Sequence, residues 1–256
     1  MPYHIANSIC SSNMQKNAYT EMYAQELTHG WYRGTREVLL AHLKKLKPQA
    51  KILDAGCGTG GTMLFLKQNH FTNVFGVDQS PLALAYSKKR GLKNLRRGSI
   101  TRLPFPKASF DAVICLDVLY HAGVNPSRAI SEFYRVLKPT GLIYLQEPAY
   151  NWLRSSHDIY IQTQHRFYRQ ELINLLRRQN FAVSKCTYLN TLLFPLQVIK
   201  RVKDKFFPSS HSDVQPLHPL VNQLLLQALR LEARLIKFIN LPFGLSLVCV
   251  GKKTGL

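Results

Sequence analysis

The chain has 256 residues, of which 46% are hydrophobic, so it can form one packed domain and is not an intrinsically disordered protein. Its formal net charge of +20 indicates an anionic partner, either nucleic acid or an anionic membrane surface, unless the whole proteome is basic. The five cysteines are scattered without a CxxC pair, which predicts free thiols in a reducing compartment, and no apolar run approaches the roughly 18 residues that cross a bilayer.

The first segment of the chain, residues 1–46, is polar and is expected to be mostly helical. Residues 21–27 form one candidate helix, and residues 36–43 form a clearer one. Between them, residues 29–34 (HGWYRG) combine aromatic side chains with glycines. Such a segment is compatible with a lid over a ligand or with a helix that packs on the edge of a sheet. We interpret residues 1–46 as an N-terminal helical lid.

Residues 51–61, with the sequence KILDAGCGTGG, are the most informative stretch of the chain. A short apolar run ends at Asp54, glycines follow, and a helical pattern begins near Met63. A strand, a glycine turn and a helix in this order bring backbone N–H groups close to a ligand, because glycine has no Cβ to hold the ligand away. The stretch therefore predicts a site for a nucleotide-like cofactor.

The glycine spacing alone also fits the fingerprint of a dinucleotide site, so the neighbouring charge decides between cofactors. The carboxylate of Asp54 would repel the pyrophosphate of a dinucleotide, whereas it suits the ammonium and the sulfonium of S-adenosylmethionine. The segment DAGCGTG, from Asp54 to Gly60, resembles motif I of class I S-adenosylmethionine-dependent methyltransferases. The resemblance implies S-adenosyl-L-methionine as the cofactor and makes Arg33 or Arg36 a candidate partner of its carboxylate. It also implies cofactor contacts for Asp54, Gly56, Cys57, Gly58 and Gly60.

A second buried strand is expected at residues 73–78, and it ends in an acid. Asp78 lies about twenty residues after the glycines, where a carboxylate can accept hydrogen bonds from both hydroxyls of a ribose. Ser80 and Pro81 then provide the N-cap and the first position of a helix. In the methyltransferase family the acid at this place binds the ribose, and the next residue, here Gln79, flanks the adenine.

Residues 94–100 are expected to form a third strand. The segment LPFPKASFD that follows resembles the family pattern that leads into the fourth strand, here residues 112–117. Where this chain has Ser99, the family usually has an acid that contacts the adenine. The hydroxyl of Ser99 and the backbone N–H of Ile100 can still meet the edge of the adenine.

The fourth strand ends at Asp117, and His121 follows in the same loop. Open α/β sheets bind ligands at the carboxyl ends of their strands, so Asp117 is expected to line the cofactor cleft. His121 is a candidate general base for the methyl acceptor, because the ordinary pKa of a histidine lies near neutral pH. The alternative is a histidine that is merely hydrogen-bonded in its loop. A helix at 126–138 and a strand at 142–146 complete the part of the chain that resembles the family core.

From residue 147 the chain leaves this common core. The loops that follow contain aromatic and imidazole side chains that are candidate contacts of the acceptor: Tyr150, Trp152, His157 and His165. The expected elements are a helix at 169–179, a sixth strand at 181–188, helices at 191–207 and 219–240, and a final strand at 242–250. Residues 152–158, 190–195 and 242–246 resemble a bacterial subgroup of the family, the methyltransferase type 11 kind.

These elements predict an α/β fold with a Rossmann-like, seven-stranded, mostly parallel sheet, helices on both faces, an antiparallel last strand and a helical cap insertion. The chain is interpreted as a single methyltransferase domain, residues 1–256. Its parts are the lid at 1–46, a cofactor-binding core at 47–148, a substrate cap with the sixth strand and the helical insertion at 149–240, and the final strand and tail at 241–256.

The resemblance implies an enzyme that transfers a methyl group in line to an O, N or C nucleophile of a small-molecule or lipid-linked acceptor. Enzymes that methylate exocyclic amino groups of bases usually have a Pro-Pro stretch after the fourth strand, whereas this chain has LDVLY at residues 116–120. An RNA methyltransferase that uses the basic surface is a disfavoured alternative, and a non-catalytic S-adenosylmethionine-binding module is another. Asp54 disfavours a dehydrogenase. No metal-ligand spacing occurs, so no metal is expected.

Residues 192–207 join an apolar half to a basic half. The apolar residues Leu193, Leu196 and Ile199 recur at helical spacing. Such a helix can lie in a membrane interface, where lysines are attracted to anionic lipid. In the alternative interpretation it is a cap helix whose apolar face packs on the domain. We expect a cytoplasmic protein and leave peripheral membrane binding open. The basic half contains Lys200, Arg201, Lys203 and Lys205.

Overall fold

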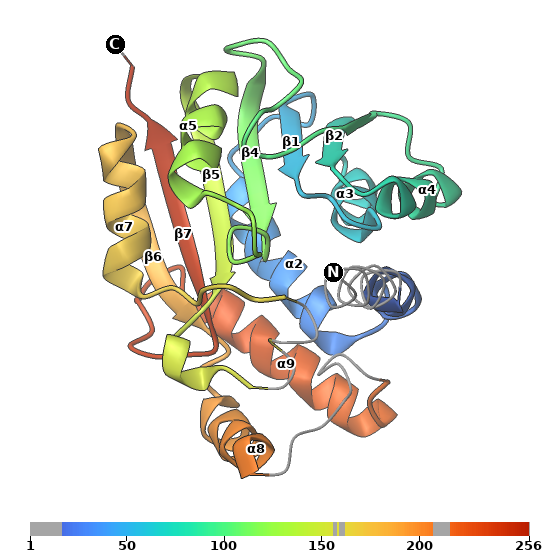
Figure 1. Ribbon diagram of the computed structural model, residues 1–256, viewed down its shortest axis with the longest axis vertical. Coiled ribbons are helices and arrows are strands. Elements are labelled where there is room, and N and C mark those ends of the chain that lie inside the picture. Colours follow the sequence, from blue (N-terminus) through green and yellow to red (C-terminus); the bar gives the residue numbers. More distant parts are fainter. Residues whose placement is uncertain (1–16, 156–157, 159–161, 207–215, 256) are drawn as a thin grey trace, which may run out of the picture.

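A seven-stranded sheet organises the chain, with the strand order β3-β2-β1-β4-β5-β7-β6 (Figure 1). The structure is a computed structural model that describes residues 17–155, 158, 162–206 and 216–255. Neighbouring strands from β1 to β5 are parallel, whereas β7 runs antiparallel to β5 and β6, which confirms the expected fold class. The strands are β1 (Lys51–Ala55), β2 (Asn73–Asp78), β3 (Leu95–Arg97), β4 (Phe110–Leu116), β5 (Leu137–Pro148), β6 (Phe181–Leu189) and β7 (Ser246–Lys253).

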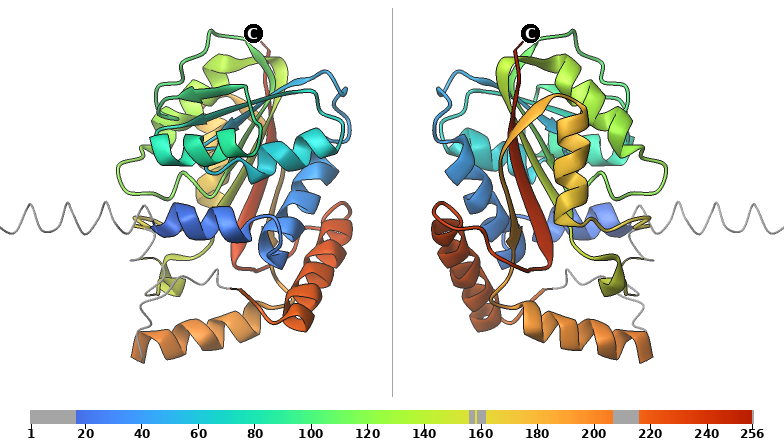
Figure 2. Two further views of the ribbon diagram at one scale, coloured as in Figure 1. Left: turned by 90° about the vertical axis from the view of Figure 1, so that its right-hand side faces the viewer. Right: turned by 90° about the vertical axis from the view of Figure 1, so that its left-hand side faces the viewer.

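Helices cover both faces of the sheet, with α5 and α7 on one face and α2, α3 and α9 on the other (Figure 2). Residues 17–25 are helical as well. The helices are α2 (Gly30–Leu43), α3 (Gly61–Gln68), α4 (Pro81–Lys89), α5 (Pro126–Val136), the short 3-10 helix η1 (Asn151–Leu153), α7 (Arg169–Arg178), α8 (Phe194–Phe206) and α9 (Pro219–Leu235).

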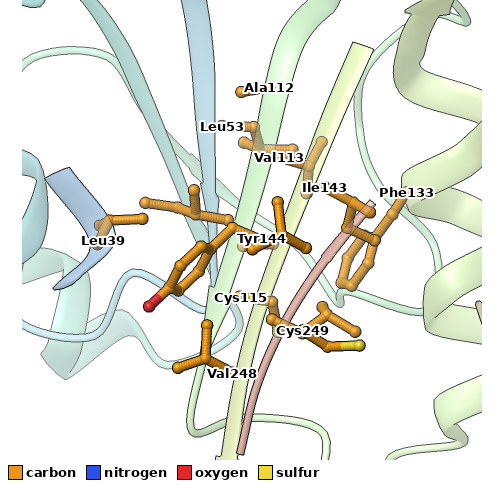
Figure 3. Packing of buried hydrophobic residues seen from close by; sticks show 14 of the residues in the cluster. Leu39, Leu53, Ala112, Val113, Cys115, Phe133, Ile143, Tyr144, Val248 and Cys249 are labelled. Atoms are coloured by element: carbon orange, nitrogen blue, oxygen red, sulfur yellow. The ribbon is translucent and has the colours of Figure 1, made fainter. Parts of the chain in front are cut away.

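The core lies on both sides of the central strands. Parallel strands are covered on both faces, so consecutive residues in the middle of β4 are apolar, and the side chains of Ala112, Val113 and Cys115 are fully buried. Figure 3 shows Leu39 of α2 on one side of these strands and Phe133 of α5 on the other. This two-sided packing fixes the strand ends, which border the functional site.

The segment at residues 29–34 is helical, because α2 begins at Gly30 and not at the expected residue 36. His29 caps the helix, since its Nδ1 accepts the N–H of Trp31 at 3.2 Å. Gly34 faces α9, and a Cβ at this position would lie 2.5 Å from the Cβ of Leu229. The glycine therefore permits close packing of α2 on α9.

The helix expected at 126–138 ends at Val136, because Leu137 already pairs with Phe110 as the first residue of β5. Beyond the carboxyl ends of the parallel strands, α8 and α9 lie together at one end of the molecule (Figures 1 and 2). None of the described helices is long and apolar enough to cross a membrane.

Candidate active site

A cavity of ≈ 490 Å³ lies at the carboxyl ends of β1, β2 and β4, the edge at which open α/β sheets bind ligands. Three parts of the chain form its wall. The N-terminal segment contributes side chains such as Tyr19 and Tyr32, the glycine turn and the strand ends form the floor, and the region after β5 contributes Arg166 and Arg201.

The carboxylate of Asp78 ends β2 and is held in the cavity wall by two backbone donors. The N–H of Gly58 donates to Oδ2 at 2.9 Å, and the N–H of Ser80 donates to Oδ1 at 2.8 Å. Burial raises the pKa of Asp78, whereas these two hydrogen bonds stabilise its charged form. Each carboxylate oxygen keeps a further lone pair, so Asp78 can accept hydrogen bonds from two ligand hydroxyls.

The anion site at the start of α3 is filled by the chain itself. A phosphate would bind at this helix N-terminus in a dinucleotide site. Here the carboxylate of Glu26 accepts the N–H of Gly61 at 3.2 Å and the hydroxyl of Thr59, while the first two N–H groups of the glycine turn donate to the C=O of Val77. The glycine turn is therefore unsuited to a pyrophosphate, in agreement with the argument from the charge of Asp54.

Glu26 also ties the N-terminal segment to the core through two buried ion pairs. Its carboxylate lies 3.0 Å from Nη2 of Arg36 and 3.0 Å from Nη2 of Arg90. The guanidinium of Arg36 is thus engaged by Glu26, and Arg33 is exposed outside the cavity wall. The structure therefore does not support the expectation that either arginine is held ready for the carboxylate of a cofactor. The chain between residues 17 and 46 offered no sequence signal that singled out Glu26.

Asp54 is a buried acid that faces the cavity at the end of β1. Its Oδ2 accepts no hydrogen bond from the described residues. Burial, followed by the nearby charge of Glu26, raises the pKa of Asp54 to about 7. A cationic ligand group next to Oδ2 would stabilise the charged form, so this acid fits an ammonium or a sulfonium.

A second group of acids lies at the ends of β4 and β5. Asp117 adopts a positive φ of 56° and accepts a hydrogen bond from Nε2 of Gln146 at 2.9 Å, while desolvation raises its pKa to about 6. Glu147 is fully buried and accepts the N–H of Leu119 at 2.9 Å. Burial, followed by the charge of Asp117, raises the pKa of Glu147 well above its ordinary value. Sequence reasoning missed Gln146 and Glu147, although their place at the end of a parallel strand could have indicated them.

The wall opposite the glycine turn is cationic. Asp158 accepts hydrogen bonds from Nε of Arg166 at 2.7 Å and from Nη1 of Arg201 at 3.2 Å. Burial acts to raise the pKa of Asp158, but the hydrogen bond and the charge of Arg166 outweigh it, and the pKa lies below its ordinary value. One carboxylate thus faces two guanidiniums. Arg201 is buried in this cluster, which corrects its assignment to the solvent-facing basic half of the helix.

His121 lies in the cavity wall between these two regions. Its ring lies against that of Tyr120, with 4.1 Å between the ring centroids and the ring planes tilted by 36°, and its backbone pairs with Thr163.

The predicted cofactor contacts lie together, with one exception. Gly60 faces away from the cavity, since a Cβ at this position would lie 2.5 Å from Cδ1 of Leu92 and 2.7 Å from Oγ of Ser87. The absence of a Cβ allows α4 to pack against the turn, and a cofactor contact of the Gly60 backbone stays a prediction. The cavity is lined by the others: Asp54, Gly56, Cys57, Gly58, Asp78, Gln79, Ser99, Ile100 and Asp117.

The predicted acceptor contacts in the cap do not line the cavity. Tyr150 stacks on Tyr188 at 5.1 Å between ring centroids, and Trp152 is half exposed beside it. The Nε2 of His165 lies 2.8 Å from Glu171. These side chains contact one another and α7 instead of this cavity, so acceptor contact by Tyr150, Trp152 and His165 stays a prediction without support from the cavity lining, while His157 lies outside the described residues.

Among the described residues, no group of three or more His, Cys, Asp or Glu side chains could hold a metal ion. Residues 53–145, which contain the glycine turn and the ends of β2 and β4, match the family model described as a methyltransferase domain.

Two curated relatives match part of the chain. The sterol 24-C-methyltransferase ERG6B of Gibberella zeae is 37% identical over 131 residues, which are 48% of this chain and 33% of that protein. The 24-methylenesterol C-methyltransferase 2 of Oryza sativa is 31% identical over 156 residues, which are 56% of this chain and 42% of that protein. The chain thus spans less than half the length of these relatives.

Two solved structures have the same fold as the chain. One is an S-adenosylmethionine-dependent methyltransferase of Thermotoga maritima, described as a possible histamine N-methyltransferase, with a TM-score of 0.58, 20% identity and coverage of 93% of this chain and 95% of that one. The other is the geranyl diphosphate C-methyltransferase of Streptomyces coelicolor, with a TM-score of 0.58, 16% identity and coverage of 86% and 78%.

Proposed function

We propose that the protein transfers a methyl group from S-adenosyl-L-methionine to a small-molecule or lipid-linked acceptor, and the match of residues 53–145 to the methyltransferase domain model supports this proposal. The observation that carries the proposal is the carboxylate of Asp78, which Gly58 and Ser80 hold in the cavity wall at the end of β2. A carboxylate in this position is suited to the two hydroxyls of a ribose.

The residues on the cavity floor fit this cofactor. Asp78 would accept the ribose hydroxyls, and the unpartnered Oδ2 of Asp54 would face a cationic group. Gln79, Ser99 and Ile100 would border the adenine, since they follow β2 and β3 at the same edge of the sheet. When bound, S-adenosylmethionine would supply the electrophile, which is the methyl carbon attached to its positively charged sulfur.

The protein would hold the acceptor in line with this methyl group and exclude water, an arrangement that can contribute roughly 7–11 kcal/mol to the lowering of a barrier. Trp31, Tyr32 and Tyr120 provide apolar and aromatic wall on the acceptor side, and Arg166 and Arg201 provide positive charge. This lining supports a small amphiphilic acceptor with an apolar body. His121 would accept a proton where the acceptor atom, an O, N or C nucleophile, loses one.

Two of the similar proteins have names that agree with such an acceptor, since one is a sterol methyltransferase and the other a geranyl diphosphate methyltransferase. Calorimetric titration of S-adenosylhomocysteine, with NADH as the control ligand, tests the cofactor. Binding of NADH, or failure of S-adenosylhomocysteine to bind, would overturn the proposal.

Incubation with methyl-labelled cofactor tests the reaction on three separate fractions, namely a lipid extract, soluble metabolites and RNA. Label in either of the first two fractions supports the proposed acceptor class. Label in RNA alone would favour the alternative of an RNA methyltransferase. Binding of the cofactor without transfer to any fraction would favour a non-catalytic binding module.

A further inference from the structure

The helix α9 has two apolar faces, and only one of them packs against other parts of the chain that the structure describes. One face is buried against the rest of the domain, including α2, through residues such as Leu226 and Leu229. The opposite face is exposed to solvent along the whole helix and just beyond its end. Its side chains recur at helical spacing: Leu220, Leu224, Leu231, Leu235 and Phe238, with exposed fractions of 70%, 69%, 48%, 37% and 86%.

The helix α8 exposes a second apolar stripe. Leu196 and Ile199 are 65% and 67% exposed, and Leu192 and Val202 continue the stripe at both ends. Most of the apolar face of this helix is therefore exposed, which disfavours the alternative that this face packs on the domain. Large contiguous apolar surfaces of this kind mark interaction sites. Figures 1 and 2 agree that α8 and α9 lie at the same end of the molecule.

The exposed charges around both stripes are basic. Lys200 and Lys203 lie on α8, and Arg234 and Lys237 lie on and just after α9. Of the described acids on these helices, Glu232 is buried and accepts the N–H of Leu192, and Oδ2 of Asp204 is buried as well. Among the described residues, the surface therefore combines apolar side chains with a predominance of positive charge.

This composition selects one kind of partner. A second copy of the chain would bring like charges together across a self-complementary interface. Nucleic acid would match the charge but would leave the leucines without apolar contact. An anionic bilayer satisfies both parts, because its headgroups attract cations and its acyl region accepts apolar side chains.

We propose that α8, α9 and residues 236–239 form a docking surface for anionic lipid bilayers. The apolar stripes enter the interface between the headgroups and the acyl chains, and the basic side chains contact the headgroups. This inference is independent of the methyl-transfer reaction, since the exposed side chains that carry it, apart from Lys200, do not line the cavity.

Vesicle sedimentation of the full chain tests the docking surface. The vesicles are phosphatidylcholine alone and an equal mixture of phosphatidylcholine and phosphatidylglycerol, each at low and high salt. We expect binding to the anionic vesicles at low salt, weaker binding at high salt, and little binding to phosphatidylcholine alone.

Two variants separate the charge from the apolar stripe. The triple charge reversal of Lys203→Glu, Arg234→Glu and Lys237→Glu should weaken binding about a hundredfold or more, as expected for the loss of three cations near a membrane. The double variant Leu224→Ser and Leu231→Ser should weaken it at least tenfold at unchanged charge. The control variant has the same change in net charge but reverses exposed lysines elsewhere: Lys67→Glu, Lys88→Glu and Lys93→Glu. It should bind anionic vesicles at least ten times more tightly than the triple charge reversal.

All substituted side chains are exposed, and circular dichroism melts of the variants should match that of the parent protein. Failure to bind anionic vesicles at low salt would overturn the proposal, and so would equal loss of binding in the control variant. A concentration-dependent dimer in sedimentation velocity that dissociates in the leucine double variant would show that a second copy covers the stripe, and would equally overturn it.

Discussion

Replacement of Glu26 by glutamine should loosen the N-terminal segment from the core. The carboxylate is 4% exposed and lies 3.0 Å from each of two buried guanidiniums, those of Arg36 and Arg90. The Glu26→Gln variant keeps the shape of the side chain but removes the negative charge between them. Removal of one partner of a buried ion pair costs about 3–5 kcal/mol, because the remaining charge stays buried without compensation.

This loss is a large fraction of the roughly 5–15 kcal/mol that stabilises a typical domain. For a chain of this size it corresponds to a fall in Tm of about 6–20 °C. Urea denaturation and calorimetry would measure it. The matched control is Glu37→Gln, which breaks the pair of Glu37 with Arg230, 3.3 Å apart and more than one third exposed, and which should cost at most about 1 kcal/mol.

Equal stability of the two variants would refute the reasoning, because it would mean that Glu26 contributes no more than a surface charge. Affinity for S-adenosylhomocysteine should fall in Glu26→Gln as well, because Glu26 and Arg36 both line the cavity. Unchanged affinity in a destabilised variant would separate the structural role of Glu26 from the site.

Three further predictions concern single groups. Asp78→Asn should raise the Kd of S-adenosylhomocysteine in calorimetry at least about tenfold, through weaker hydrogen bonds to the ribose, whereas Asp111→Asn, remote from the cavity, should leave it unchanged. The pKa of Asp54 is raised to about 7 in the folded protein, so the folded protein holds a proton that the unfolded chain releases near pH 4. The free energy of unfolding should therefore fall as the pH rises from 4 to 7, by up to about 4 kcal/mol from this group. In urea titrations, Asp54→Asn should flatten this dependence on pH. Gly34→Ala should destabilise the protein by about 1–3 kcal/mol, because its Cβ would meet Leu229 at 2.5 Å, while Arg33→Ala on the exposed side should have little effect in the same melts.

The fold and the cofactor side of the site could be predicted because their signals are local. Apolar runs that end at Asp54, Asp78 and Asp117 indicated three parallel strands, and the turn after β1 indicated the ligand edge. Ser80 caps α4, as its sequence position before a proline predicts, and its Oγ accepts the N–H of Ala83 at 3.3 Å.

The other half of the site could not be predicted in this way, because its contacts join residues that are distant along the chain. The pairs of Glu26 with Arg90 and of Asp158 with Arg201 depend on tertiary packing, which no local pattern encodes. The aromatic and imidazole composition of the cap did not indicate which side chains face the cavity, because several of them contact one another instead. His165 was taken for a ligand contact, but it pairs with Glu171 across the start of α7.

Amphipathic spacing has a related limit, because it shows that a helix face is apolar but not what covers it. In α9 the spacing holds on two opposite faces, and only the structure distinguishes Leu229, which is buried, from Leu224, which is exposed. The same two cap helices also contribute to the cavity, through Lys200 of α8 and Leu225 of α9. The proposed docking surface and the cavity thus share these two helices. A lipid-linked acceptor would give both surfaces a use in one reaction, whereas a soluble acceptor would leave the exposed stripes of α8 and α9 unexplained.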